Sequence, residues 1–199
     1  MNWKRFLAVF VIFCMISGFS VQVEAAGNKN QKAMKAYGVF LQKVEYAQGG
    51  FFVVDINKDG IKELFVTKKL DSSDFMMKYH HYSKVEVYTY TKGKLKRLKN
   101  LQIGVYNFKY SKKLKCLAID LNAADREVIE IYKLKKAKLI KVGIFDSGFN
   151  TSPKYRNCIT NKTTYYKNYN SYHKQVSKYG TKEIVFIKNY VSNRDKYLK

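Results

Sequence analysis

Residues 51–66 read Phe-Phe-Val-Val-Asp-Ile-Asn-Lys-Asp-Gly-Ile-Lys-Glu-Leu-Phe-Val, and this stretch decides the fold. Its two apolar ends predict buried strands, because short aromatic and β-branched runs bounded by turn residues are typical of strands. The polar residues between them favour a tight reversal, since Asn and Asp-Gly are common turn residues. The sequence therefore predicts a β-hairpin, with strands over residues 51–56 and 61–67, at the start of a β-rich domain.

The turn of this hairpin carries oxygen-bearing side chains at alternate positions. Asp55, Asn57 and Asp59 are followed by Gly60, which allows a sharp reversal. A Ca²⁺ ion takes about six to eight oxygen ligands from a loop that curls around it. The sequence therefore predicts one structural Ca²⁺. Its candidate ligands are Asp55, Asn57, Asp59, the backbone carbonyl of Ile61, and Glu63 as the closing ligand.

An ion-free turn is the alternative, with Lys58 and Lys62 neutralising the carboxylates. Three close carboxylates repel one another, and a bound cation would relieve this repulsion. The three acids lie close in the sequence although the whole chain contains only 15 acidic residues, which favours the ion. An EF-hand does not fit, since its loop needs a bidentate Glu at the twelfth position. Counted from Asp55, that position is Val66, inside a predicted strand.

The pattern Asp-x-Asn-x-Asp-Gly-x-x-Glu resembles the calcium loop between strands of FG-GAP and VCBS repeats. The resemblance covers residues 55–64 and the apolar runs beside them, and it implies a Ca²⁺-binding β-hairpin. Propellers built from such repeats carry several copies, whereas this chain has one good copy. The wider order also resembles small, uncharacterised secreted proteins of Gram-positive bacteria, in which a leader and a helix precede such a hairpin and Tyr-rich meanders follow it.

Residues 1–25 are predicted to be a secretory signal peptide. Lys4 and Arg5 precede an apolar run, and Val23-Glu24-Ala25 has the small residues of a cleavage site. An uncleaved membrane anchor is the alternative. Cleavage predicts a secreted, extracellular protein with no membrane span.

The remaining chain predicts one α+β domain. Residues 26–145 are expected to hold an N-terminal helix, over residues 31–47, packed on an antiparallel β-meander of blade-like hairpins. One strand of this meander is expected over residues 102–110. Residues 146–199 are expected to extend the same domain with a small hairpin and a helix–strand–helix region. Within this last part, the sequence predicts a helix over residues 168–179 and a strand over residues 183–187.

One hairpin of the meander occurs twice. The hairpin over residues 85–98 matches residues 129–140 when the numbers are shifted by 44, close to the period of about 40–45 residues of a four-stranded blade. The matched pairs are Glu86/Glu130, Tyr88/Tyr132, Lys92/Lys136, Lys94/Lys138 and Leu95/Leu139. Two copies are too few to close a propeller, so a meander with weak internal repetition is predicted.

Two cysteines remain after the leader, Cys116 and Cys158. In an oxidising exterior they can form one disulfide, and two buried free thiols are the equal alternative. The sequence contains no cysteine–histidine cluster of the kind that binds zinc. His80 and His81 are predicted to be loop residues.

The chain is strongly basic, with 38 Lys and Arg against 15 Asp and Glu. Loss of Lys4, Arg5 and Glu24 with the leader changes the formal charge from +23 to +22. Such a field attracts anionic partners, although lysines spread along the chain are also typical of a simply solvated surface. Export and the lack of a recognised module disfavour nucleic acid as the partner.

The sequence contains no Ser/His/Asp, Cys/His or nucleotide-binding pattern that would predict catalysis. We therefore predict a monomeric, non-catalytic, cell-wall-associated protein. Its lysines are expected to meet the phosphates or carboxylates of an anionic wall polymer or glycan, and its tyrosines to stack on sugar rings. The alternative is a secreted hydrolase of wall or extracellular polysaccharide that uses Asp/Glu pairs. The matched Glu86 and Glu130 are expected to have packing or surface roles.

Overall fold

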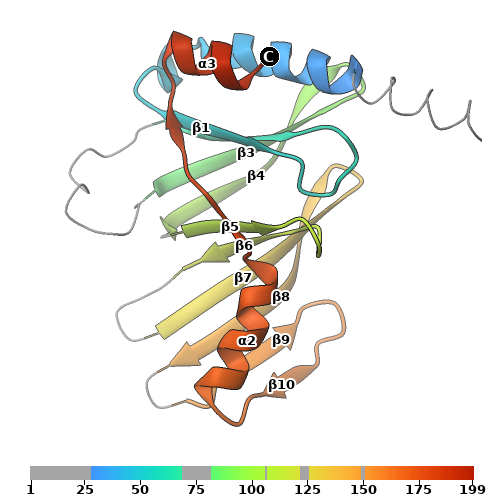
Figure 1. Cartoon of the computed structure of the whole chain (residues 1–199), viewed down its shortest axis with the longest axis vertical. Helices are drawn as coiled ribbons and strands as arrows, with labels where there is room; N and C mark the ends of the chain where they lie inside the picture. Colours follow the sequence, from blue (N-terminus) through green and yellow to red (C-terminus); the bar gives the residue numbers. More distant parts are fainter. Residues whose placement is uncertain (1–27, 69–81, 106, 122–125, 149–150) are drawn as a thin grey trace, which may run out of the picture.

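The computed structural model describes residues 28–68, 82–105, 107–121, 126–148 and 151–199 (Figure 1). The predicted signal peptide and the two adjacent histidines lie outside these residues. Two antiparallel sheets form the centre of the molecule, and helices cover their outer faces. The predicted α+β class, with an N-terminal helix packed on antiparallel strands, is confirmed.

The first sheet has five strands in the spatial order β12-β1-β2-β3-β4. All neighbours in it are antiparallel. Its strands are Gly50–Val54 (β1), Glu63–Thr67 (β2), Tyr82–Thr91 (β3), Lys94–Val105 (β4) and Ile187–Lys188 (β12). The hairpin predicted from residues 51–66 is therefore β1–β2, and its two apolar runs pair with each other.

The second sheet has seven strands in the order β10-β9-β8-β7-β6-β5-β11, again antiparallel. Its strands are Asn107–Ser111 (β5), Cys116–Asp120 (β6), Arg126–Lys135 (β7), Lys138–Gly148 (β8), Lys154–Asn157 (β9), Thr163–Tyr165 (β10) and Lys182–Ile184 (β11). The sequence predicted one strand over residues 102–110. The structure instead ends β4 at Val105 and begins β5, in the other sheet, at Asn107.

The N-terminal helix spans residues 28–41 and is followed by a 3-10 turn, Val44–Tyr46 (η1). It ends earlier than predicted because Lys43 is extended and the buried Tyr46 turns its hydroxyl toward the sheet, where it donates to Glu86 at 2.7 Å. The other helices are Tyr169–Tyr179 (α2) and Val191–Tyr197 (α3). Across the described residues, no helix combines the length and the apolar character needed to span a bilayer.

Strands β1–β4 and β5–β8 form the same four-stranded unit twice, here called the first unit and the second unit. The hairpin predicted to repeat has the same irregularity in both, since the register shifts between Val87 and Tyr88 in β3 and between Ile131 and Tyr132 in β7. Both hairpins also close through a two-residue turn with positive φ, at residues 92–93 and at residues 136–137. Such turns match the twist of the strands that they join.

The two units pack head to tail. Leu64, Val66 and Tyr88 of the first unit contact the N-terminal helix. Leu117 pairs with Tyr132 in the second unit as Leu64 pairs with Tyr88 in the first unit. The equivalent residues of the second unit are therefore Leu117, Ile119 and Tyr132, and their side chains pack against the first unit. The opposite faces follow the same order: Phe65, Val85 and Val87 lie between the sheets, whereas their equivalents Ala118, Ile129 and Ile131 lie under α2. Each helical layer therefore covers one end of a two-unit stack (Figure 1).

The C-terminal segment ties the two units together. Strand β11 pairs with β5 of the second unit, and β12 pairs with β1 of the first unit. Ile184, which ends β11, and Phe186, which lies between the two strands, are buried in the core between the sheets. The centroid of the Phe186 ring lies 5.7 Å from that of Phe108. The strand predicted over residues 183–187 is split because the segment crosses from one sheet to the other.

Both cysteines of the described residues are free thiols. Cys116 is buried under α2, and Cys158 is half-buried after β9. Burial raises the pKa of the Cys116 thiol to about 11. Of the two alternatives left open by the sequence, the structure has free thiols, although only one of them is buried.

Candidate metal loop and lysine clefts

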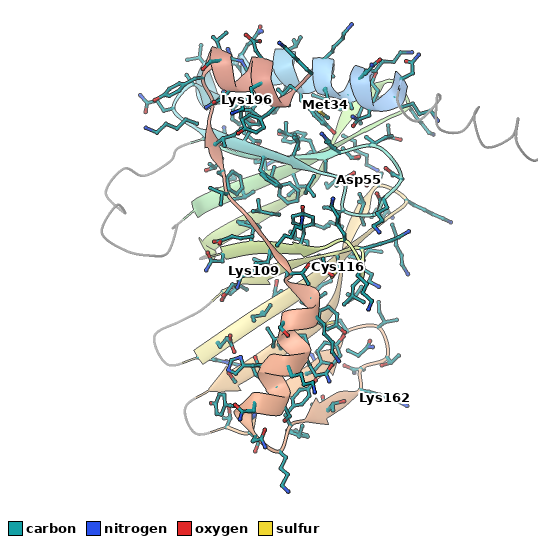
Figure 2. The ribbon with its side chains drawn as sticks, viewed as in Figure 1. Met34, Asp55, Lys109, Cys116, Lys162 and Lys196 are labelled. Carbon is teal, nitrogen blue, oxygen red and sulfur yellow. The ribbon has the colours of Figure 1, made fainter. Side chains whose placement is uncertain are left out.

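The loop of residues 55–62 joins β1 to β2 and is held against the N-terminal helix. The Lys62 N–H donates to Asn30 Oδ1 at 3.0 Å, and the Tyr37 hydroxyl donates to the Lys62 carbonyl at 2.8 Å. Figure 2 places Asp55 between Met34, on the N-terminal helix, and Cys116, at the start of β6. The loop therefore lies beside the boundary between the two units.

The side chains of Asp55, Asn57 and Asp59 converge on the backbone of their own turn. Asp55 accepts hydrogen bonds from the Asp59 N–H at 3.2 Å and the Gly60 N–H at 3.0 Å. Asn57 Oδ1 accepts from the Asp59 N–H at 3.3 Å, and Asp59 Oδ1 accepts from the Ile61 N–H at 2.9 Å. Gly60 has a φ of 86°, which suits glycine. The structure thus brings three predicted ligands together, with Ile61 directly after them.

Glu63 turns toward the inside of the molecule. It is fully buried, and its carboxylate accepts from the Ile56 N–H at 3.0 Å and from the Thr89 hydroxyl at 3.2 Å. Burial raises the pKa of Glu63 to about 8, and the nearby Asp59 and Asp55 add to the rise. The predicted closing ligand is therefore held apart from the other three by bonds of its own.

The oxygens of the loop are of the type that Ca²⁺ prefers, but they do not form a closed cage. Among the described residues, no group of three or more His, Cys, Asp or Glu side chains converges to hold a metal ion. Each oxygen that accepts one N–H still has a second lone pair available to a cation. Residues Asp55, Asn57 and Asp59 fit part of a Ca²⁺ site, and closure by Glu63 would need its side chain to turn. The calcium site therefore stays a prediction.

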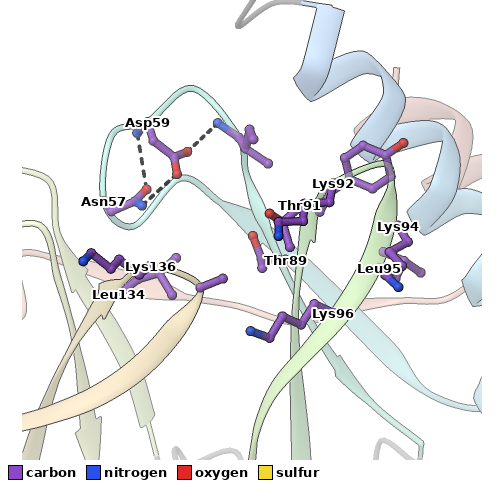
Figure 3. Close-up of a pocket in the computed structure, with 13 residues that line it drawn as sticks. Asn57, Asp59, Thr89, Thr91, Lys92, Lys94, Leu95, Lys96, Leu134 and Lys136 are labelled. Carbon is purple, nitrogen blue, oxygen red and sulfur yellow. Dashed lines mark hydrogen bonds between the residues drawn. The ribbon is translucent and has the colours of Figure 1, made fainter.

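A cleft of about 640 Å³ lies beside this loop (Figure 3). We call it the first cleft. Its walls come from the loop, from the β3–β4 hairpin and from the tip of the β7–β8 hairpin, so both units contribute. The charged side chains that line it are Lys92, Lys94, Lys96, Lys136 and Asp59. Lysines therefore outnumber acids by four to one in this lining.

A second cleft of about 440 Å³ lies between the β5–β6 turn and the β7–β8 hairpin. Its charged lining residues are Lys113, Lys115, Lys133 and Lys135, with no acid among them. Asn57 and Leu134 line both clefts. The candidate metal loop is therefore also the shared wall of two basic clefts.

The eight cleft lysines carry unpaired charge. Seven are exposed, and Lys133 is half-buried. Within the described part of the chain, none of them lies within ion-pair distance of a carboxylate, whereas Arg97 pairs with Glu86 at 2.9 Å. The sequence showed dispersed lysines, and the fold gathers these because the β1–β2, β3–β4, β5–β6 and β7–β8 turns meet around the clefts. The matches of Lys92 with Lys136 and of Lys94 with Lys138 were the sequence features that pointed to repeated basic turns.

The matched glutamates have structural partners. Glu86 is buried and accepts from the Tyr46 hydroxyl at 2.7 Å, the Tyr88 hydroxyl at 2.8 Å and Arg97. Burial opposes its ionisation, but these hydrogen bonds and the Arg97 charge hold the pKa of Glu86 below its usual value. In the second unit, Glu130 accepts in the same way from Tyr132 and Lys141. Both carboxylates therefore fasten neighbouring side chains of their own sheet, and Glu86 also fastens Tyr46 of η1.

Comparison of the chain with protein-family models, curated proteins and solved structures finds no match. The resemblance to FG-GAP and VCBS loops thus rests on residues 55–64 and the apolar runs beside them. The case for a function rests on the geometry of the loop and the two clefts.

Proposed function

We propose that this chain is a secreted, non-catalytic protein that binds an anionic cell-surface polymer through the two lysine clefts. One structural Ca²⁺ in the loop of residues 55–62 is part of the proposal. The observation that carries it is a set of eight lysines gathered in two clefts that share Asn57, with no carboxylate partner among the residues that the structure describes. A polymer is favoured over a small anion because the charges extend over two adjoining hollows.

Clefts concentrate the effect of these charges. Field lines from like charges focus in a concave, low-dielectric site, which raises the local concentration of counter-ions and the rate of association. A surface on which lysines merely keep the protein soluble has no need to gather them around two hollows. Attraction of this kind weakens with salt, because mobile ions screen it over about 8–10 Å at physiological ionic strength.

Tyrosine stacking on sugars has narrower support. Tyr90 lines the first cleft, where its ring can contact a sugar. The exposed tyrosines at positions 165, 169, 190 and 197 belong to the C-terminal part of the chain and line neither cleft. Charge is therefore proposed to supply most of the affinity.

The Ca²⁺ ion is proposed to bind Asp55, Asn57, Asp59 and the Ile61 carbonyl, with Glu63 as a further ligand once its side chain turns. The support is the chemistry of the donors and the close carboxylates in a lysine-rich chain, which a divalent cation would neutralise. The role is structural, because the loop forms a wall of both clefts. Bound calcium would hold that wall in place.

Cosedimentation with purified Gram-positive cell walls over a salt series tests polymer binding. We expect strong binding at low salt and release as salt rises. A variant with Lys92, Lys96, Lys113 and Lys135 changed to Gln should lose most binding. The control changes Lys32, Lys35, Lys162 and Lys174 to Gln, which removes the same charge from exposed sites elsewhere. Equal losses in the two variants would contradict the clefts as the site.

Thermal and chemical unfolding with calcium or with a chelator tests the metal. Binding to the native state alone should add about 2.7 kcal/mol at a calcium concentration about 100 times the Kd. Asp55→Asn and Asp59→Asn should abolish the increase, whereas Asp195→Asn, at an exposed acid on α3, should keep it. An identical midpoint with calcium and with chelator would refute the calcium site while leaving the cleft proposal standing.

A further inference from the structure

We infer that the ligand of the clefts is a linear phosphate polymer that occupies both clefts in one extended run, crossing between them over Asn57. The inference rests on the proposed function and specifies its ligand. It arises from how the lysines are distributed over the strands that wall the clefts.

The β7–β8 hairpin separates the two clefts and supplies lysines to each. Lys133 and Lys135 line the second cleft, and the next residue, Lys136, lines the first. Lys135 is the last residue of β7 and Lys136 begins the turn, so the tip of the hairpin presents one charge to each cleft. Leu134 and Asn57 line both clefts, which makes them the crossing point. A chain that leaves one cleft at this point enters the other.

Each cleft contains one pair of lysines on the same face of a strand. These are Lys94 and Lys96 in β4, and Lys133 and Lys135 in β7, two residues apart in each case. This spacing places their backbone positions about 6.6 Å apart. Pairs of ammonium groups along a strand suit a ligand with repeated anionic groups. A single compact anion would use only part of either lining.

The cations of the two clefts are of a type that binds phosphate. Lysine supplies all eight positive charges of the two linings, and arginine supplies none. The lysine ammonium is a compact point charge with three rotatable donors and commonly binds phosphate, whereas the planar arginine fork is preferred where a carboxylate or a phosphate is held in a bidentate pair. Asp59 is the single acid beside the path, and it lies next to the crossing point.

The decisive experiment measures binding of end-labelled inorganic polyphosphate of defined lengths by fluorescence anisotropy, in buffer with chelator, over a salt series. On the scale of about −0.7 per neutralised phosphate for single strands, eight contacts predict a log–log salt slope of about −6 for long chains. Variants with the four lysines of either cleft changed to Gln should each give about −3. The control with Lys32, Lys35, Lys162 and Lys174 changed to Gln should stay near −6.

Chain length separates one continuous site from two independent sites. For one run across both clefts, long chains should bind at least about tenfold more tightly than chains that fill one cleft, because the second contact becomes intramolecular. Loss of either cleft should then reduce long chains to the affinity of short ones. A mere twofold loss in each single-cleft variant would overturn the inference, and equal losses in cleft and control variants would overturn the proposed function as well.

Two further arms test the crossing point and the chemistry. Asp59→Asn should strengthen binding of long chains about twofold to fivefold by removing repulsion beside the path, and should leave the affinity of single phosphate unchanged. No change for long chains would overturn the route over Asn57. Polygalacturonate of matched charge should bind more weakly than polyphosphate, and equal or tighter binding would overturn the phosphate assignment. Unchanged melting midpoints of all variants establish that lost binding reflects the clefts.

Discussion

The two four-stranded units share one scaffold but differ most in the first turn. In the first unit, residues 55–62 form a long loop whose two aspartates and one asparagine fold back on it. In the second unit, residues 112–115 form a short turn that reads Lys-Lys-Leu-Lys. The strands that flank these turns pair in the same way in both units. The difference teaches that the strands fix where a turn lies, while its residues set the chemistry.

A second difference follows from the head-to-tail packing. Glu63 and Cys116 occupy equivalent positions, since the next residues, Leu64 and Leu117, pair with Tyr88 and Tyr132. Glu63 is buried and accepts from the Ile56 N–H and the Thr89 hydroxyl of its own unit, whereas Cys116 lies under α2. Equivalent positions thus meet different neighbours, because each unit is covered by a different layer. The exposed ends of such a stack need caps, as in other repeat proteins.

Weakening the packing of α2 on the second unit should have the largest effect on stability. Tyr172 is fully buried against Phe145 and Ile131 of the second unit. Tyr172→Ala should cost about 3–5 kcal/mol, measured by denaturant unfolding, because it removes a buried aromatic ring. The face that it uncovers corresponds to the face through which the first unit packs, so self-association should rise in sedimentation velocity. Tyr169→Ala, on the exposed side of α2, is the control. A comparable loss there would contradict the cap.

The matched glutamates should contribute different amounts to the free energy of unfolding. Glu86→Ala leaves two tyrosine hydroxyls and Arg97 without their acceptor, and a loss of about 2–4 kcal/mol is expected. Glu130→Ala removes fewer contacts, with one hydroxyl and one lysine, so a loss of about 1–2 kcal/mol is expected. Urea unfolding of both variants measures the difference. Equal losses would show that the extra bond from Tyr46 adds nothing.

The strand that extends the second sheet can be tested at Gly143. A Cβ added there would clash with the Tyr155 ring of β9, so one of the two must shift. The equivalent position of the first unit is Lys99 in β4, which is an edge strand with no further neighbour. Gly143→Ala should cost about 1–3 kcal/mol through overpacking. The same change combined with Tyr155→Ala should cost less than the sum of the two changes. Additive losses would exclude the clash as the cause.

Local patterns predicted much of the fold. The β1–β2 hairpin, the α2 helix between Asn168 and Gly180, and the 44-residue match followed from periodicity and turn residues. The division into two sheets did not, because the apolar pattern continues through residues 102–110, where the chain passes from β4 to β5. The split of β11 from β12 was missed for the same reason. The sheet to which a strand belongs depends on the strand with which it pairs, and a local sequence pattern contains no information about that pairing.

The candidate site divides in the same way. Asp55, Asn57 and Asp59 could be found together because alternate spacing in one turn is a local property. The buried orientation of Glu63 could not, since it depends on Thr89 of another strand. The clefts depend still more on tertiary structure, because turns from both units come together to form them. The dispersed lysines therefore predicted a strongly basic protein but did not predict where on the molecule the charge gathers.

The smallest expected effect concerns an ion pair that the first unit lacks. Asp146 in β8 pairs with Arg126 in β7, which holds the pKa of the Asp146 carboxyl below its usual value, and Lys154 adds to the effect. Matched positions of the first unit are Gln102 and Tyr82, which cannot form this pair. A depressed folded-state pKa stabilises the protein above the unfolded pKa of about 3.9, and this stabilisation is lost as pH falls through the folded value.

Asp146→Asn should therefore lower stability by about 0.5–1 kcal/mol near neutral pH, since the arginine is largely exposed. The difference from the wild type should shrink as pH falls from about 5 toward 2, because protonation of Asp146 then removes from the wild type the charge that the variant already lacks. Unfolding free energies measured at a series of pH values give this difference, with Asp195→Asn as the control for an exposed, unpaired acid. A pH-independent difference would assign the loss to packing, and the ion pair would then not distinguish the second unit from the first.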